Sequence, residues 1–173
     1  MENLKISRAA MENLNQLQMI GRQTFSETFA AVNTEEDMAS YLAESFADDK
    51  LSADLKSPFS QFYFAWLEGE VVGYLKLNTG AAQTDIKDQD ALEIERIYVL
   101  KEFHGKNVGQ LLYHKAIEIA QEMGAQYVWL GVWENNPRAI RFYEKNGFVE
   151  FDQHIFMLGT DEQTDIMMKK ILK

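Results

Sequence analysis

The turn His104-Gly105-Lys106-Asn107-Val108-Gly109 has the residue types of a phosphate-binding turn. Glycine lets backbone N–H groups approach a ligand closely, and asparagine adopts a left-handed conformation more readily than most residues with a side chain. The helix predicted to begin after this turn adds free N–H donors and a partial positive charge. The turn therefore predicts a phosphate or pyrophosphate site, although ordinary packing of a strand against a helix would explain the same glycines.

Two further segments lie where they could take part in chemistry beside a bound phosphate ligand. Ile97-Tyr98-Val99 ends the strand before the turn, and open α/β sheets bind ligands at the carboxyl ends of their strands. Asn136 and Pro137 begin a second helix as its cap and first residue. Tyr143 lies about two turns further along this helix. It could protonate a leaving group near the strand ends, or it could be a packed core tyrosine.

The spacing of apolar residues predicts the elements that position these residues. Apolar runs and alternation predict strands over 4–8, 61–67, 71–78, 92–100, 127–132, 148–158 and 164–172. Spacings of three and four predict helices over 14–29, 34–46, 108–122 and 137–145, and the polar segment 48–58 is expected to be a connection. The order is β-α-α-β-β-β-α-β-α-β-β. It predicts an α/β (α+β) fold with a mixed sheet, because the central strand–helix–strand unit needs a parallel pair.

Composition and charge narrow the class of protein. The chain has 173 residues, 46% of them hydrophobic, which favours a single domain over residues 1–173. Its formal net charge of −10 repels nucleic acid and anionic lipid, so neither is expected as a partner. It has no cysteine, and His104, His114 and His154 lack metal-ligand spacing, so no metal is expected. Without a signal peptide or an apolar run long enough to span a membrane, a cytoplasmic location is expected.

At these residues the chain resembles the GNAT superfamily of N-acetyltransferases. The phosphate turn of that family reads Gln/Arg-x-x-Gly-x-Gly/Ala. Gly109 matches the last position, while His104 and Asn107 replace the first residue and the first glycine. A second motif, Asn-x-x-Ala-x-x-Leu/Phe-Tyr followed by Gly-Phe, matches at Asn136, Ala139, Phe142, Tyr143, Gly147 and Phe148. The resemblance covers nearly the whole chain and implies a mostly antiparallel sheet of about seven strands flanked by four helices.

The resemblance also implies acetyl-CoA (coenzyme A) as co-substrate and assigns roles to residues. Ile97 and Val99 would offer backbone groups to the acetyl and pantetheine parts. Asn136 would contact the pantetheine arm, although capping its own helix explains this residue equally well. Tyr143 would protonate the departing thiolate. The whole implied coenzyme site comprises Ile97, Tyr98, Val99, His104, Gly105, Lys106, Asn107, Val108, Gly109, Gln110, Asn136 and Tyr143.

Acetyl transfer to nitrogen needs a neutral amine, whereas a primary amine with a pKa of about 10.4 is mostly protonated at neutral pH. Many relatives carry a glutamate base on the fourth strand, and this chain has Glu93 and Glu95 there. In a regular strand both carboxylates share a face with Ile97 and Val99, and a β-bulge would break that parity. Pairing with Arg96 or exposure to solvent is the alternative for either glutamate.

The ribosomal-protein N-terminal acetyltransferases carry their glutamate base on the fifth strand, five residues before the motif asparagine. Gly131 takes that place here, which argues against their mechanism. A looser resemblance, over 24–29, over 33–38 with Tyr41 after it, and over 130–134, is to PaiA-type polyamine acetyltransferases. It makes Glu27 and Tyr41 the expected contacts for a cationic amine, with ordinary helix core as the alternative for neighbouring aromatic residues.

The predicted reaction is direct acetyl transfer to a primary amine of a small molecule, with polyamines as leading acceptors. A glutamate or a water-linked path would remove the amine proton, and the tyrosine would act as the acid. A protein or peptide N-acetyltransferase and a non-catalytic acyl-CoA-binding regulatory module stay open as alternatives. A homodimer is one expected assembly.

Overall fold

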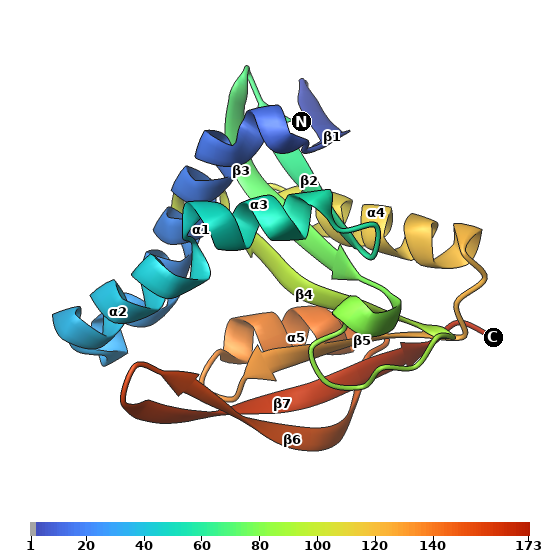
Figure 1. The fold of residues 1–173 in the computed structure, drawn as a ribbon. Coiled ribbons are helices and arrows are strands. Elements are labelled where there is room, and N and C mark those ends of the chain that lie inside the picture. The colour runs from blue at the N-terminus through green and yellow to red at the C-terminus, as the bar shows by residue number, and fades with distance from the viewer. Residues whose placement is uncertain (1–2) are drawn as a thin grey trace.

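A seven-stranded sheet with helices on both faces makes up the structure, a computed structural model that describes residues 3–173 (Figure 1). The strand order is β1-β2-β3-β4-β5-β7-β6, and β4–β5 is the parallel pair among these residues. The other neighbouring strands pair antiparallel. The mixed, mostly antiparallel sheet predicted from the sequence is confirmed.

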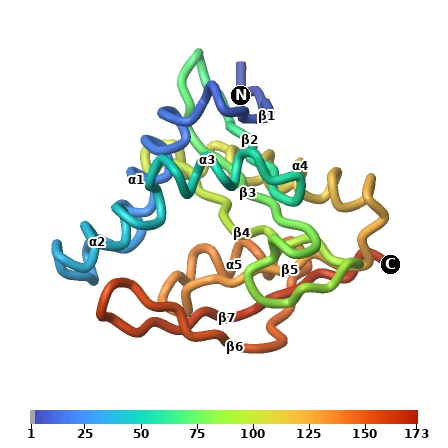
Figure 2. Tube along the Cα trace, in the orientation of Figure 1, coloured from blue at the N-terminus to red at the C-terminus, as the bar shows by residue number. Residues whose placement is uncertain are grey.

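The bounds of the elements follow the sequence prediction closely, as the Cα trace shows from end to end (Figure 2). The strands are β1 (Leu4–Arg8), β2 (Ser60–Leu67), β3 (Glu70–Asn78), β4 (Ala91–Val99), β5 (Tyr127–Trp133), β6 (Val149–Leu158) and β7 (Asp161–Ile171). The helices are α1 (Leu14–Phe29), α2 (Glu35–Ser45), α3 (Asp48–Lys56), α4 (Val108–Glu122) and α5 (Pro137–Lys145). The predicted and observed ends differ by three residues at most.

The helix α3 occupies a segment that was expected to be a connection, so that prediction was wrong. Only Leu51 and Leu55 give α3 an apolar side, which is too short a repeat to indicate a helix from sequence. Both leucines pack into the core beneath α1, and this packing stabilises the helix. Asp48 in the first turn and Lys56 in the last turn also suit the helix dipole. The described residues therefore form five α-helices rather than the predicted four.

Hydrophobic cores lie on opposite faces of the sheet (Figure 1). The helices α4 and α5 cover one face, where Leu112 of α4 and Tyr143 of α5 pack with Leu130 of β5. The helices α1, α2 and α3 cover the other face, where the core is rich in aromatic residues such as Phe25 and Phe46. No helix in residues 3–173 is long and apolar enough to cross a membrane.

The strands β4 and β5 pair only over their first halves. Their last paired residues are Ile94 and Leu130, although both strands continue. Beyond this point β4 stays paired with β3 as far as Val99, and β5 stays paired with β7 as far as Trp133. The sheet therefore opens between β4 and β5 and leaves their facing backbone groups without a strand partner.

Candidate active site

A cleft of about 880 Å³ lies where β4 and β5 separate. Its walls come from these two strands, α1, α2, the start of α4, α5 and the hairpin of β6 and β7. Every site residue predicted from the sequence lines this cleft except Lys106. The fold thus brings together residues from Glu27 to Tyr143 that lie far apart in the chain.

The backbone of β4 offers hydrogen-bonding groups to the cleft at Ile97 and Val99. The Leu100 N–H donates to the Val72 carbonyl at 2.9 Å, so Leu100 and Tyr98 direct their backbone groups toward β3. Ile97 and Val99 therefore direct theirs to the opposite edge, where β5 is no longer paired. An extended ligand chain can take the place of a strand there, as the predicted pantetheine arm requires. Tyr98 can reach such a ligand only through its side chain.

The His104 side chain links the phosphate turn to the end of β4. Its Nε2 lies 2.8 Å from the Val99 carbonyl oxygen, so this nitrogen carries the hydrogen and donates it. Burial lowers the pKa of His104, which keeps the imidazole neutral at pH 7. His104 therefore ties the turn to β4 as a neutral donor, and the Val99 N–H stays directed toward the cleft.

The turn before α4 has the backbone geometry of an anion site. Gly105 and Asn107 have φ values of +80° and +65°, the left-handed region that glycine and asparagine tolerate best. The first backbone hydrogen bond of α4 runs from the Leu111 N–H to the Asn107 carbonyl at 3.0 Å. The N–H groups of residues 108–110 precede this bond, so they have no carbonyl partner within the helix. They line the cleft and fit a phosphate group.

Lys106 lies in the turn, but its side chain does not line the cleft. Its ammonium lies 5.4 Å from the centroid of the Phe103 ring, in a cation–π contact. The residue can still serve the turn through its backbone, whereas its predicted contact with the coenzyme has no support from the position of its side chain.

The helix α5 positions Asn136 and Tyr143 along the cleft. Asn136 caps the helix, because its Oδ1 accepts the Ala139 N–H at 3.3 Å. Its side-chain amide also borders the cleft, so the two explanations offered for Asn136 are compatible. Tyr143 is 7% exposed, and burial raises its pKa above the ordinary value. The phenol therefore stays protonated and can act as a proton donor.

A β-bulge at Glu95 decides which side chains of β4 share a face. The register with β3 skips from Arg96 to Ile94 and leaves Glu95 without a partner. Ile94 and Ile97 therefore both pack into the core on the α4 side, although they are three residues apart. The glutamates lie on the opposite face with Arg96. The bulge therefore separates the glutamates from the face of Ile97 and Val99, which a regular strand would have had them share.

The Glu95 carboxylate is held by cations. Its Oε1 lies 2.9 Å from the Lys76 ammonium and accepts a hydrogen bond from the Asn78 amide at 2.8 Å. Its Oε2 lies 3.5 Å from Arg96 Nε. Burial alone would raise the pKa of Glu95, but Lys76 and Arg96 outweigh it and lower that pKa to about 2. A carboxylate with so low a pKa is a weak base.

The Glu93 carboxylate is buried and anchors a loop. The side chain is 2% exposed, and its Oε1 accepts the Asn78 amide at 3.0 Å and the Thr84 N–H at 2.8 Å. The Thr84 hydroxyl donates to the other oxygen. Burial raises the pKa of Glu93, and these hydrogen bonds partly oppose the rise. Glu93 is therefore the more basic of the two glutamates, but both of its oxygens already accept hydrogen bonds.

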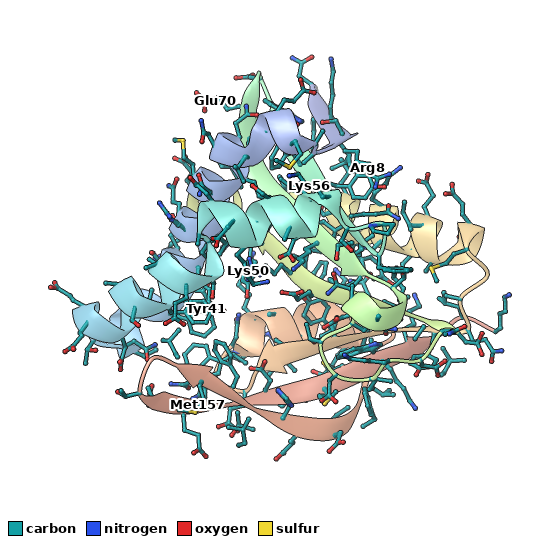
Figure 3. The ribbon with its side chains drawn as sticks, viewed as in Figure 1. Arg8, Tyr41, Lys50, Lys56, Glu70 and Met157 are labelled. Atoms are coloured by element: carbon teal, nitrogen blue, oxygen red, sulfur yellow. The ribbon has the colours of Figure 1, made fainter. Side chains whose placement is uncertain are left out.

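The wall of the cleft formed by α1, α2 and β6 is aromatic. Tyr41 stacks on Phe25 with ring centroids 4.3 Å apart and meets Phe156 of β6 edge-on at 5.7 Å. Figure 3 shows Tyr41 between α2 and the β6–β7 hairpin. The Glu27 carboxylate also borders the cleft, but one of its oxygens accepts the Lys101 N–H at 3.0 Å. Tyr41 is thus part of the aromatic core and of the cleft wall at once.

Asp165 and Arg96 line the cleft but were not predicted to function there. Arg96 is paired with Glu95 and lies over the Phe46 ring at 4.7 Å. Asp165 comes from β7, in a stretch of mixed polar and apolar residues that carries no motif. The cleft receives both side chains through strand register, so no local signal in the sequence identifies them.

The fold, the opening between β4 and β5 and the turn at the start of α4 define a coenzyme A-dependent acyltransferase. Residues 22–148 match the model of the acetyltransferase (GNAT) family. The chain belongs to this family, and it is an acetyl-CoA-dependent N-acetyltransferase of the GNAT type.

Individual relatives agree with this assignment over the whole chain. An uncharacterized N-acetyltransferase of Lactobacillus delbrueckii subsp. lactis is 42% identical over 99% of both chains. The spermidine N(1)-acetyltransferase of Thermoplasma acidophilum is 26% identical and covers 97% of this chain and 98% of its own. A crystal structure of PaiA N-acetyltransferase from Thermoplasma acidophilum in complex with coenzyme A has a TM-score of 0.80. It is 24% identical and covers 97% of this chain and 98% of its own, so this likeness supports the fold.

Proposed function

We propose that this N-acetyltransferase transfers the acetyl group directly to a primary amine of a small molecule, with polyamines such as spermidine as the first acceptors to consider. The observation that carries the proposal is the division of one cleft into two chemical halves. One half presents the free N–H groups of residues 108–110 and the open edge of β4. The other half presents aromatic rings and carboxylates, which suit a cation.

The coenzyme half fits the chemical groups of acetyl-CoA. The N–H groups at the start of α4 suit the pyrophosphate, and the edge of β4 at Ile97 and Val99 suits the pantetheine arm. When bound, acetyl-CoA supplies the thioester. Tyr143 on α5 is the proposed donor of a proton to the departing sulfur, since burial raises its pKa and keeps it protonated.

The acceptor half supplies charge and a route for the amine proton. Glu27 and Tyr41 are the proposed contacts for the amine. A carboxylate of the cleft removes the amine proton, directly or through water, and Glu93 and Glu95 are the two candidates predicted from the sequence. Of the two, Glu93 has the more favourable pKa, because Lys76 and Arg96 hold Glu95 as an anion. A spermidine acetyltransferase among the relatives supports the substrate class. The cytoplasmic location and the homodimer predicted from sequence remain part of this proposal.

An amine panel tests the proposal. The protein is incubated with acetyl-CoA and one amine at a time, and the release of free thiol is measured. The amines are spermidine, spermine, propylamine, an aminoglycoside and short peptides. The expected result is a much lower KM for spermidine than for propylamine, because propylamine lacks a second cation. Turnover of peptides alone would overturn the small-molecule acceptor. Acetyl-CoA that raises the melting temperature without any thiol release would indicate a binding module.

A further inference from the structure

The carboxylate of Asp165 on β7 lies over Gly131 on the neighbouring strand β5. A β-carbon built on Gly131 would lie 3.3 Å from Asp165 Oδ2, a closer approach than most such contacts. The register pairs Gly131 with Met167 and Asp165 with Trp133, so Asp165 reaches its diagonal neighbour. The missing side chain at Gly131 provides the space that the carboxylate uses.

This position coincides with the opening of the sheet. Leu130 is the last residue of β5 that pairs with β4, and Gly131 is the next residue along the strand. Asp165 and Gly131 both line the cleft, on the face where Trp133 packs with the aromatic core beneath α1 and α2. The carboxylate therefore meets the cleft on its acceptor side, at the point where the two strands part.

The Asp165 carboxylate has no hydrogen-bond or ion-pair partner within residues 3–173. Burial raises the pKa of Asp165 to about 6, and the positive charge that His154 acquires on protonation opposes this rise. His154, on β6, is itself 3.2 Å from Asp85. On its other side β5 contributes Gly131 and Trp133, which carry no charge. A partly buried carboxylate without a partner is costly to maintain, which favours a functional role.

Five carboxylates line the cleft, and the three on β4 and β7 differ in the hydrogen bonds and ion pairs that they already make. Glu95 is bound by Lys76 and Arg96, and Glu93 accepts hydrogen bonds from Asn78 and Thr84. Of these three, Asp165 has both oxygens free of a hydrogen-bond donor within the described chain, and its pKa of about 6 lies near the pH at which a general base works best.

We propose that Asp165 takes the proton from the acceptor amine, an inference that rests on the proposed function. The ammonium gives one proton to Oδ2, and the neutral nitrogen uses its lone pair to form a bond to the acetyl carbonyl carbon. The C–S bond breaks, and its electron pair stays on sulfur. Tyr143 gives its proton to that sulfur and recovers one from the acylated nitrogen, while Asp165 releases its proton to solvent. Gly131 is the positioning residue that leaves room for this carboxylate.

The variant Asp165→Asn keeps the shape of the side chain and removes its basicity. We expect kcat/KM for spermidine to fall by about 10²-fold or more, while the Kd for coenzyme A stays within twofold of the wild-type value. The matched control is Glu162→Gln, because Glu162 is an exposed carboxylate on the same strand. The wild-type pH profile should show a limb near pH 6 that is missing in Asp165→Asn.

Two further measurements distinguish loss of the base from a general loss of structure. Carboxyl ¹³C NMR of the ligand-free protein should show one aspartate that titrates near pH 6 and is lost in Asp165→Asn. Gly131→Ala should also lower kcat, because its methyl group displaces the carboxylate without removing it. Full activity of Asp165→Asn, a limb retained in that variant, or an Asp165 midpoint near the ordinary value would each overturn the inference. A wild-type protein that acetylates no amine would instead overturn the proposed function, and the role of Asp165 that rests on it.

Discussion

The buried ammonium of Lys76 on β3 lies 2.9 Å from Oε1 of Glu95 in the bulge of β4. The same ammonium lies 3.0 Å from Asp54 of α3, and the lysine side chain is only 4% exposed. The pair therefore joins the bulge to the helix that covers it. It also explains why a glutamate on the fourth strand is stabilised as an anion instead of being available as a base.

Replacing Lys76 by Met should destabilise the protein strongly, because it leaves Arg96 as the one cation beside the buried Glu95 carboxylate among the described residues and removes one partner of Asp54. Breaking a buried ion pair costs about 3 kcal/mol or more. The measurement is the free energy of unfolding in urea at pH 7. Lys50→Met is the matched control, since Lys50 also pairs with Asp54 but is 52% exposed. A surface pair of this kind contributes less than about 1 kcal/mol, so equal losses would contradict the prediction.

Tyr143→Phe should lower kcat by about 10²-fold and leave the Kd for coenzyme A nearly unchanged. The phenol is held protonated by burial, and phenylalanine keeps the ring while removing the proton donor. Steady-state kinetics and calorimetric binding separate the two effects. Tyr113→Phe is the control, because Tyr113 is also a buried tyrosine, with a hydroxyl that accepts a hydrogen bond from Lys170 at 2.8 Å, but it lies outside the cleft. Unchanged turnover in Tyr143→Phe would show that the acid is another group.

Asn107→Val should weaken the binding of coenzyme A, because a β-branched residue is strained at a φ of +65°. A cost of about 1–2 kcal/mol corresponds to a rise in Kd of roughly 5–30-fold. Isothermal titration calorimetry measures it directly. Asn107→Gly is the matched control, since glycine adopts the same φ without strain and should leave Kd within about twofold. Equal affinities for both variants would mean that the turn does not hold the phosphates.

Asp165→Asn should raise the melting temperature at pH 8 and have little effect at pH 4. The pKa of Asp165 is about 6 in the folded protein, above the ordinary value of 3.8, so ionisation destabilises the fold. This penalty is complete above pH 6, shrinks as the pH falls through 6, and disappears below the ordinary value. It amounts to about 1–2 kcal/mol after allowance for partial exposure, or roughly 2–8 °C in a thermal melt. No gain at pH 8 would contradict a raised pKa.

The coenzyme half of the site could be predicted because its parts are local. The turn from His104 to Gly109 is contiguous, and the need for left-handed backbone can be inferred from Gly105 and Asn107 themselves. The cap at Asn136 and the helical spacing to Tyr143 likewise involve residues within one element. Lys106 shows the limit of such reasoning, since its ammonium lies over the Phe103 ring and the residue does not line the cleft.

The remaining features depended on which segments meet in space. The helix α3 forms because Leu51 and Leu55 find a core, and the bulge at Glu95 arises from its register with β3. Gly131 and Asp165 are far apart in the chain and adjacent only because β5 pairs with β7. The sequence by itself determined the elements other than α3, the phosphate turn and the family. Strand register and burial decided which carboxylates are bound by cations, which accept hydrogen bonds and which have no partner in the described chain. The reason is that charge interactions depend on distance and desolvation, not on sequence position.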